Sequence, residues 1–260
     1  MIEEPQWVTT PEGQTLAVRV QPGRAPWVVF LGGFRSDMEG TKAQHLAQWC
    51  AHTGQAFLRF DYSGHGLSQG SFAAGTISRW SAEAVGIIQT CVPGSCVLVG
   101  SSMGGWIMLH VAQALASQVV GLLGIAAAPD FTRELVSRDL TSAQRDELQS
   151  RGQVMLTSDY DPQGFLLTQG FINDGEAQCL LDRPIRLNMP VRLLQGCADA
   201  EVPWRTALRL ADALDTQDVR VQLFKDGDHR LSSTAQLAVL TETLAELLKA
   251  LGQSEVVGGG

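Results

Sequence analysis

The sequence Cys96-Val97-Leu98-Val99-Gly100-Ser101-Ser102-Met103-Gly104 joins an apolar run to a helix-like stretch over 105–116. An apolar strand, a sharp turn and a helix, in that order, are typical of a nucleophile elbow, in which a strained turn holds one serine clear of the sheet. The residues two places before and two places after that serine must be nearly free of side chain, so that the turn can close. Ser102 has glycine at both places, whereas Ser101 would have valine and methionine there. Ser102 is therefore the candidate nucleophile.

An acid and a histidine follow later in the chain, each on a loop after an expected strand. A serine hydroxyl at neutral pH needs a base that takes its proton, and the base needs a carboxylate behind it. The strand over 191–195 leads into a loop that contains Asp199, and the strand over 219–224 leads into a loop that contains His229. We therefore predict Ser102, Asp199 and His229 as the catalytic residues. Glu201, two residues further on, and Asp130, at the end of an earlier strand, are the competing acids.

Two backbone N–H groups are expected to bind the oxyanion that forms during acyl transfer. One is the N–H of Met103, at the positive end of the helix that follows Ser102. The second is expected from Gly32-Gly33-Phe34-Arg35, after a strand over 27–31, and we predict the N–H of Phe34. His65 lies in a glycine-rich turn before the elbow in the chain, which favours a structural role over that of the base.

Strand and helix patterns alternate along most of the chain, which predicts a mostly parallel sheet with helices on both faces. The alternation stops between 131 and 189, where charged residues are interleaved with leucines. This pattern predicts amphipathic helices inserted as a cap between two core strands. We expect a core made of residues 1–130 and 190–251, a helical cap over 131–189 and a disordered tail over 252–260. The expected strands are 15–20, 27–31, 56–60, 96–99, 119–128, 191–195 and 219–224, and the expected helices are 41–53, 77–90, 105–116, 204–214 and 234–251.

Composition excludes several classes of function. The chain has 260 residues, of which 45% are hydrophobic, and this suits one large domain. A net charge of -8 argues against nucleic acid or an anionic membrane as the main partner. The acidic start and the lack of a long apolar run predict no membrane span and a cytoplasmic location. Five scattered cysteines without zinc spacing are expected to be reduced thiols, and we predict no metal and no cofactor.

The chain resembles the alpha/beta-hydrolase family over 27–251. Within that family it is similar to the subfamily of depalmitoylating hydrolases that also cleave acyl glucuronides, together with its bacterial members. The resemblance implies Ser102 as nucleophile, Asp199 as acid and His229 as base, a Ser-linked acyl intermediate and no cofactor. The chain departs from the subfamily in starting without a pattern typical of a transit peptide, which favours a bacterial source. The matching motifs are Gly40-Thr41-Lys42-Ala43, Arg59-Phe60-Asp61-Tyr62-Ser63-Gly64, Val99-Gly100-Ser101-Ser102-Met103-Gly104-Gly105-Trp106, Arg192-Leu193-Leu194, Val202-Pro203-Trp204 and Asp228-His229-Arg230.

These observations predict a serine hydrolase that cleaves acyl esters or thioesters, carried on a small molecule or an acylated protein. The alternatives are a cofactor-free peroxidase or lyase on the same fold, and a non-catalytic ligand-binding protein. The cap leaves from the carboxyl end of a strand, where ligands bind in sheets of this type, so we expect it to roof the space above Ser102. Its leucines, with Phe131, Phe165 and Phe171, favour a medium to long acyl chain.

Overall fold

A central sheet of eight strands organises the molecule. The computed structural model describes residues 4–158 and 161–257. The strand order is β1-β2-β4-β3-β5-β6-β9-β10. β2 pairs antiparallel with both of its neighbours, β1 and β4, and every other neighbouring pair is parallel. The mostly parallel sheet matches the expectation from the sequence. The strands are β1 (Gln6–Thr9), β2 (Thr15–Gln21), β3 (Arg24–Leu31), β4 (Gln55–Phe60), β5 (Cys96–Ser101), β6 (Val119–Ile125), β9 (Val191–Gly196) and β10 (Val219–Phe224).

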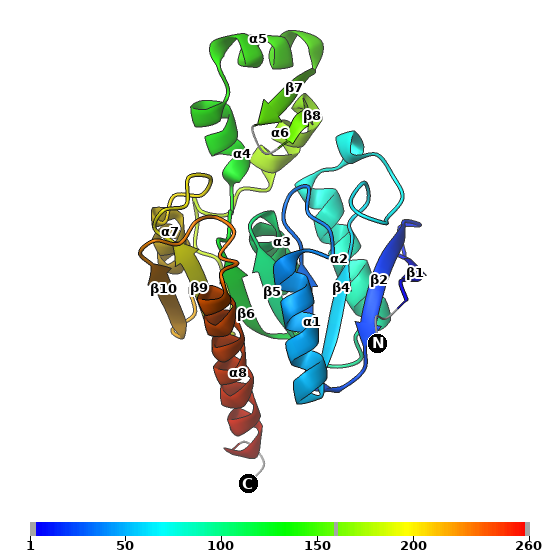
Figure 1. The fold of residues 1–260 in the computed structure, drawn as a ribbon, viewed down its shortest axis with the longest axis vertical. Helices are drawn as coiled ribbons and strands as arrows, with labels where there is room; N and C mark the ends of the chain where they lie inside the picture. Colours follow the sequence, from blue (N-terminus) through cyan, green and yellow to red (C-terminus); the bar gives the residue numbers. More distant parts are fainter. Residues whose placement is uncertain (1–3, 159–160, 258–260) are drawn as a thin grey trace.

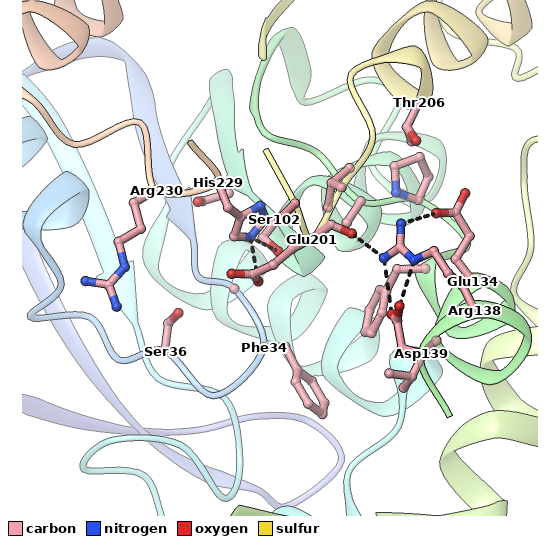
Figure 2. Close-up of a pocket in the computed structure, with 18 of the residues that line it drawn as sticks. Phe34, Ser36, Ser102, Glu134, Arg138, Asp139, Glu201, Thr206, His229 and Arg230 are labelled. Atoms are coloured by element: carbon pink, nitrogen blue, oxygen red, sulfur yellow. Dashed lines mark hydrogen bonds and ion pairs between the residues drawn. The ribbon is translucent and has the colours of Figure 1, made fainter. Parts of the chain in front are cut away.

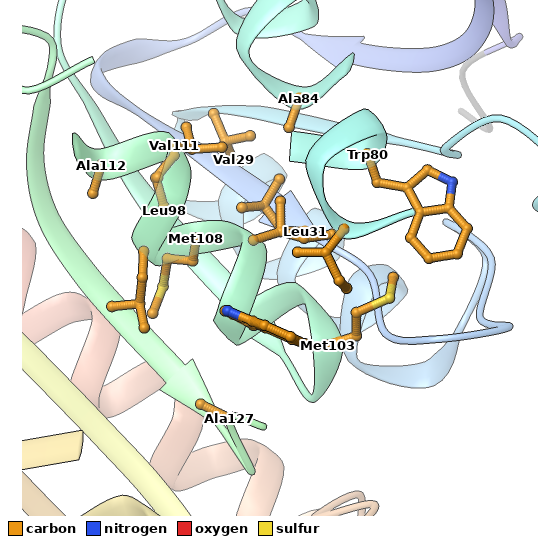
Figure 3. Close-up of a cluster of buried hydrophobic side chains, with 14 of the residues drawn as sticks. Val29, Leu31, Trp80, Ala84, Leu98, Met103, Met108, Val111, Ala112 and Ala127 are labelled. Carbon is orange, nitrogen blue, oxygen red and sulfur yellow. The ribbon is translucent and has the colours of Figure 1, made fainter. Parts of the chain in front are cut away.

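Helices cover both faces of this sheet (Figure 1). α1 (Thr41–Thr53) and α8 (Thr234–Val257) lie on one face, and α2 (Ile77–Cys91), α3 (Met103–Ala114) and α7 (Arg205–Ala213) lie on the other. Successive strand residues point to opposite faces, so β3 sends Val29 into the cluster beside α2 and α3 and Val28 into the cluster beside α1 and α8. Figure 3 shows the first of these clusters. Continuous apolar strands are thus buried on both sides, as a parallel sheet requires.

Residues 131–189, which we call the cap, leave the sheet after β6 and return before β9. Figure 1 shows the cap beyond the carboxyl ends of the central strands. It contains α4 (Phe131–Glu134), a π-helical turn (Leu135–Asp139), α5 (Ser142–Arg151), β7 (Gln153–Ser158), β8 (Asp161–Thr168) and α6 (Gln169–Ala177). The cap was expected to consist of helices, and the antiparallel β7–β8 hairpin was not predicted. The reason is Met155, an exposed apolar residue that hides the alternation of buried Val154 and Leu156.

The C-terminal helix is longer than expected. α8 continues to Val257, where a disordered tail was expected from residue 252 on, and residues 258–260 lie outside the described residues. Gly252 costs a helix only about 1 kcal/mol relative to alanine, and no proline follows it within α8. Within the described ranges, no helix combines the length and the apolarity that crossing a bilayer requires.

Candidate active site

Ser102 occupies the sharp turn between β5 and α3. Its backbone has φ 54° and ψ -120°, a conformation that costs an L-residue roughly 1–3 kcal/mol. The turn is held because the N–H of Ser102 donates to the carbonyl of Ile125 at 2.9 Å, at the end of the neighbouring strand β6. A Cβ on Gly104 would overlap the Leu31 carbonyl, and a Cβ on Gly100 would overlap the carbonyl of Gly104. Glycine is therefore required at both places, as the elbow pattern predicts.

The structure brings Ser102, Asp199 and His229 together from the ends of three strands, β5, β9 and β10 (Figure 2). Nε2 of His229 lies 3.1 Å from Oγ of Ser102, and Nδ1 of His229 lies 2.9 Å from Oδ2 of Asp199. The Asp199 side chain has no exposed surface, and the His229 side chain is 17% exposed. The histidine thus bridges a buried carboxylate and a hydroxyl that faces a cavity.

Asp199 is held as a carboxylate. Burial raises the pKa of Asp199, but hydrogen bonds from His229 and from the N–H groups of Val202 and Glu201 outweigh it, and the pKa lies below its ordinary value. Oδ1 accepts the N–H of Val202 at 2.8 Å and that of Glu201 at 2.9 Å, and Oδ2 accepts Nε2 of Gln195 at 2.9 Å. An ionised Oδ2 can only accept, so Nδ1 of His229 carries the proton and Nε2 is free to accept the proton of Ser102.

Neither competing acid reaches Nδ1 of His229. The Glu201 carboxylate lies 3.5 Å from Nε2, on the opposite side of the ring, and its side chain is 67% exposed. Asp130 instead accepts the N–H groups of Leu180 and Leu181 at 2.8 and 2.9 Å. It therefore ties the start of the cap to the chain that leaves α6, which is a structural task.

The two expected oxyanion donors lie on either side of the elbow. Met103 is the first residue of α3, so its N–H has no partner within the helix. Phe34 lies in a turn in which the N–H of Ser36 donates to the carbonyl of Gly33 at 3.1 Å. That turn packs closely on the elbow, because a Cβ on Gly33 would lie 3.3 Å from Cβ of Ser102. The two segments that carry the predicted donors therefore lie close to each other at Ser102.

A cavity of about 570 Å³ opens above Ser102 and His229. Phe131, Leu135 and Phe165 of the cap line it, in agreement with the expected roof, but Phe171 is buried in the core instead. The cap also contributes charged residues that the sequence did not single out. Arg138 donates to Oδ1 of Asp139 at 2.7 Å and to the carbonyl of Glu201 at 2.9 Å, which joins the cap to the loop of Asp199 (Figure 2). The lining therefore combines apolar and charged side chains.

No cluster of three or more His, Cys, Asp or Glu side chains suited to a metal ion occurs in the part of the chain that the structure describes. The buried thiols of Cys50 and Cys96 have pKa values that burial raises to about 12, so neither is a thiolate at neutral pH. Cys197, on the loop of Asp199, is half-buried and makes no disulfide.

Comparison with known proteins identifies the family. The model of a family described as serine aminopeptidase, S33, matches residues 25–161. Palmitoyl-protein thioesterase ABHD10 of mouse, named as mitochondrial, is 39% identical over 239 residues, which are 91% of this chain and 80% of that protein. The chain belongs to the alpha/beta hydrolases, in the family of ABHD10. The resemblance stated from the sequence motifs is thereby confirmed.

Solved structures agree with this assignment. The hydrolase superposes on a protein from Agrobacterium vitis S4 with a TM-score of 0.89 and 39% identity, covering 94% of this chain and 98% of that one. Mouse alpha/beta hydrolase domain-containing protein 10 gives a TM-score of 0.88 and 37% identity, covering 95% and 99%. The predicted alpha/beta-hydrolase fold is therefore confirmed over nearly the whole chain.

Proposed function

We propose that this hydrolase cleaves acyl esters and thioesters through an acyl-enzyme on Ser102. The observation that carries the proposal is the continuous contact from Asp199 through His229 to Oγ of Ser102, at the floor of a cavity. The strained elbow supports it further, since a backbone held at positive φ needs a reason to persist.

The proposed reaction has two halves. In the first, Nε2 of His229 takes the hydroxyl proton while Oγ of Ser102 forms a bond to the substrate carbonyl carbon. The N–H groups of Met103 and Phe34 bind the oxyanion, and the imidazolium then returns the proton to the departing alkoxide or thiolate as its bond to carbon breaks. In the second half, water gives a proton to His229 as its oxygen bonds to the acyl carbon. The bond from that carbon to Oγ of Ser102 then breaks, the imidazolium returns the proton to Oγ, and the carboxylic acid is released. Asp199 stabilises the imidazolium in both halves.

An acyl chain is the proposed substrate group in this cavity. Phe131, Leu135 and Phe165 supply an apolar lining there, and mouse ABHD10 is named as a palmitoyl-protein thioesterase. Each buried methylene contributes about 0.8 kcal/mol. We therefore propose that kcat/KM rises as the acyl chain lengthens from two to eight carbons. A cytoplasmic location and the absence of a nucleic-acid partner stay predictions.

The experiment compares hydrolysis of acetyl and octanoyl thioesters and p-nitrophenyl esters by the wild type, Ser102→Ala and Ser101→Ala. We expect Ser102→Ala to lose nearly all activity and Ser101→Ala, its matched neighbour, to retain it. If the folded wild type hydrolyses none of these esters and thioesters, the proposal is overturned in favour of a peroxidase, a lyase or a non-catalytic protein. A kcat/KM that is highest for acetyl would overturn the acyl-chain assignment alone.

A further inference from the structure

The turn that carries the N–H of Phe34 has an unusual residue at its third position. The hydrogen bond from Ser36 to Gly33 closes a four-residue turn, and Arg35 has φ 60° while Phe34 has a negative φ. Positive φ at the third position alone defines a type II turn, which normally has glycine there. A left-handed arginine costs about 1–2 kcal/mol, so a neighbouring group must favour this form.

His65 provides that neighbouring group. The N–H of Arg35 donates to Nε2 of His65 at 3.2 Å. The other ring nitrogen, Nδ1, lies 3.3 Å from the carbonyl oxygen of Ser63, and His65 is only 4% exposed. The imidazole lies among aromatic rings, with its centroid 5.0 Å from that of Trp80 and 5.2 Å from that of Phe72. Its position is thereby fixed relative to the core.

The two contacts of His65 require the same tautomer. A carbonyl oxygen can only accept, so Nδ1 carries the proton and donates to Ser63. Nε2 then has a free lone pair, which accepts the N–H of Arg35. Burial lowers the pKa of His65, which keeps the ring neutral and the lone pair available.

The lone pair of His65 selects one orientation of the peptide between Phe34 and Arg35. In the type II turn that peptide presents its N–H to Nε2. If the peptide flipped to the type I form, the carbonyl oxygen of Phe34 would face the same lone pair, and the two acceptors would repel each other.

The orientation of the Phe34–Arg35 peptide also affects the Phe34 N–H, which belongs to the same turn. The Phe34 N–H shares a peptide with the carbonyl of Gly33 and points the opposite way, out of the turn. The Phe34 ring points away from Ser102 and His229 in Figure 2 and packs on Phe165 and Phe131 of the cap at centroid distances of 5.3 and 5.7 Å. These contacts hold the side chain, but a ring contact does not choose a peptide orientation. The hydrogen bond from Arg35 to His65 makes that choice.

We propose that His65 is a positioning residue for the oxyanion site, holding the Gly33–Ser36 turn in the form that aims the N–H of Phe34 at the substrate carbonyl. The inference rests on the proposed acyl-transfer function. A displacement of about 1 Å at such a donor costs up to about 100-fold in rate. His65 thus acts through Arg35 and Phe34 and does not touch the substrate.

The test compares His65→Phe, which keeps a ring among Trp80 and Phe72 but removes the acceptor, with His65→Gln, whose amide oxygen can take the place of Nε2. His110→Phe is the control, because His110 is a half-buried histidine on α3 whose pKa is also lowered by burial. We expect kcat on an octanoyl thioester to fall about tenfold or more in His65→Phe, with KM within about twofold. His65→Gln is expected to recover most of the loss.

A second readout separates positioning from general damage. An octyl trifluoromethyl ketone forms a hemiketal oxyanion on the serine, so its Ki should rise in His65→Phe by the factor by which kcat/KM falls. His110→Phe should change the melting temperature and leave both quantities unchanged. Unchanged kcat in His65→Phe, an unchanged Ki despite reduced kcat, or an equal loss in His110→Phe would each overturn the proposal.

The tautomer of His65 can be measured in the wild type, so this test does not depend on whether a variant folds. The ¹⁵N shifts of His65 should show a proton on Nδ1 and none on Nε2, and a proton on Nε2 would overturn the proposal. If the wild type hydrolyses no ester, the proposed function is wrong. The tautomer of His65 then still tests whether His65 holds the Gly33–Ser36 turn.

Discussion

Oδ2 of Asp199 lies 2.9 Å from Nδ1 of His229, on the side of the imidazole that faces away from Ser102. This contact fixes which ring nitrogen carries the proton and therefore which one can act as base. The loop that holds Asp199 follows β9, and the loop that holds His229 follows the adjacent parallel strand β10. Parallel pairing of neighbouring strands is thus what brings the carboxylate and the imidazole to the same edge of the sheet.

Replacing Asp199 tests this orientation. Asp199→Asn should lower kcat by about 10⁴-fold, because an amide no longer stabilises the imidazolium or its tautomer. Glu201→Gln is the matched control, since Glu201 lies beside Nε2, and its loss should be at least 100-fold smaller. Steady-state kinetics on a p-nitrophenyl ester measure both. A larger loss in Glu201→Gln would assign the acid to Glu201.

Asp130 should affect stability far more than chemistry. Asp130→Asn turns one acceptor into a donor opposite the N–H groups of Leu180 and Leu181, and a buried unsatisfied N–H costs about 1–3 kcal/mol. We expect a loss of that size in the free energy of unfolding from urea titration. The kcat of the folded fraction should fall much less than in Asp199→Asn. Normal stability combined with a 10⁴-fold loss of kcat would contradict this account.

The glycines around the elbow should differ sharply in their tolerance of a methyl group. Gly104→Ala should destabilise the protein by about 3 kcal/mol, because the new Cβ meets the Leu31 backbone carbonyl. Gly32→Ala is the control, since no atom lies within 4 Å of the Cβ it would add, and it should leave the free energy of unfolding within about 0.5 kcal/mol. Thermal and urea unfolding measure both variants. Equal effects would show that the elbow is less tightly packed than described.

Asp218 should contribute to stability only above acidic pH. Bidentate hydrogen bonds from buried Arg192, at 2.9 and 3.0 Å, lower the pKa of Asp218 below its ordinary value. A carboxylate whose pKa is lower in the folded state stabilises the fold above the unfolded pKa, and the contribution is lost as pH falls through the folded pKa. The stability difference between the wild type and Asp218→Asn should therefore be constant from pH 7 to about pH 5 and shrink toward pH 3. A difference that grows as the solution is acidified would show that the sign is wrong.

Local signals along the chain predicted the core of the fold well. The α1 helix has the predicted bounds because Gly54, in the left-handed region at φ 70°, ends it. β5 and β9 are buried along their whole length, and β10 pairs with β9 in parallel. Each of the three strands ends where turn residues begin in the sequence. The positions of Asp199 and His229 on loops after these strands then placed them near Ser102.

The remaining features depend on tertiary contacts that no local pattern reports. Arg35 adopts a turn conformation that usually requires glycine, and its N–H is bound by His65, which lies 30 residues further along the chain. Arg138 lies in a charged stretch of the cap that is indistinguishable in sequence from a solvated helix face, yet it reaches the loop of Asp199. The helix α8 passes through Gly252, where a tail was predicted to begin.

Covalent labelling tests the central claim most directly. The wild type, Ser102→Ala and Ser101→Ala are treated with a fluorophosphonate, and the adduct is located by tandem mass spectrometry. A fluorophosphonate reacts far faster with a serine that a neighbouring base activates than with an ordinary serine. The account predicts a single adduct on Ser102 in the wild type and in Ser101→Ala, and none in Ser102→Ala. An adduct on another residue, or equal labelling of Ser102→Ala and the wild type, would contradict it.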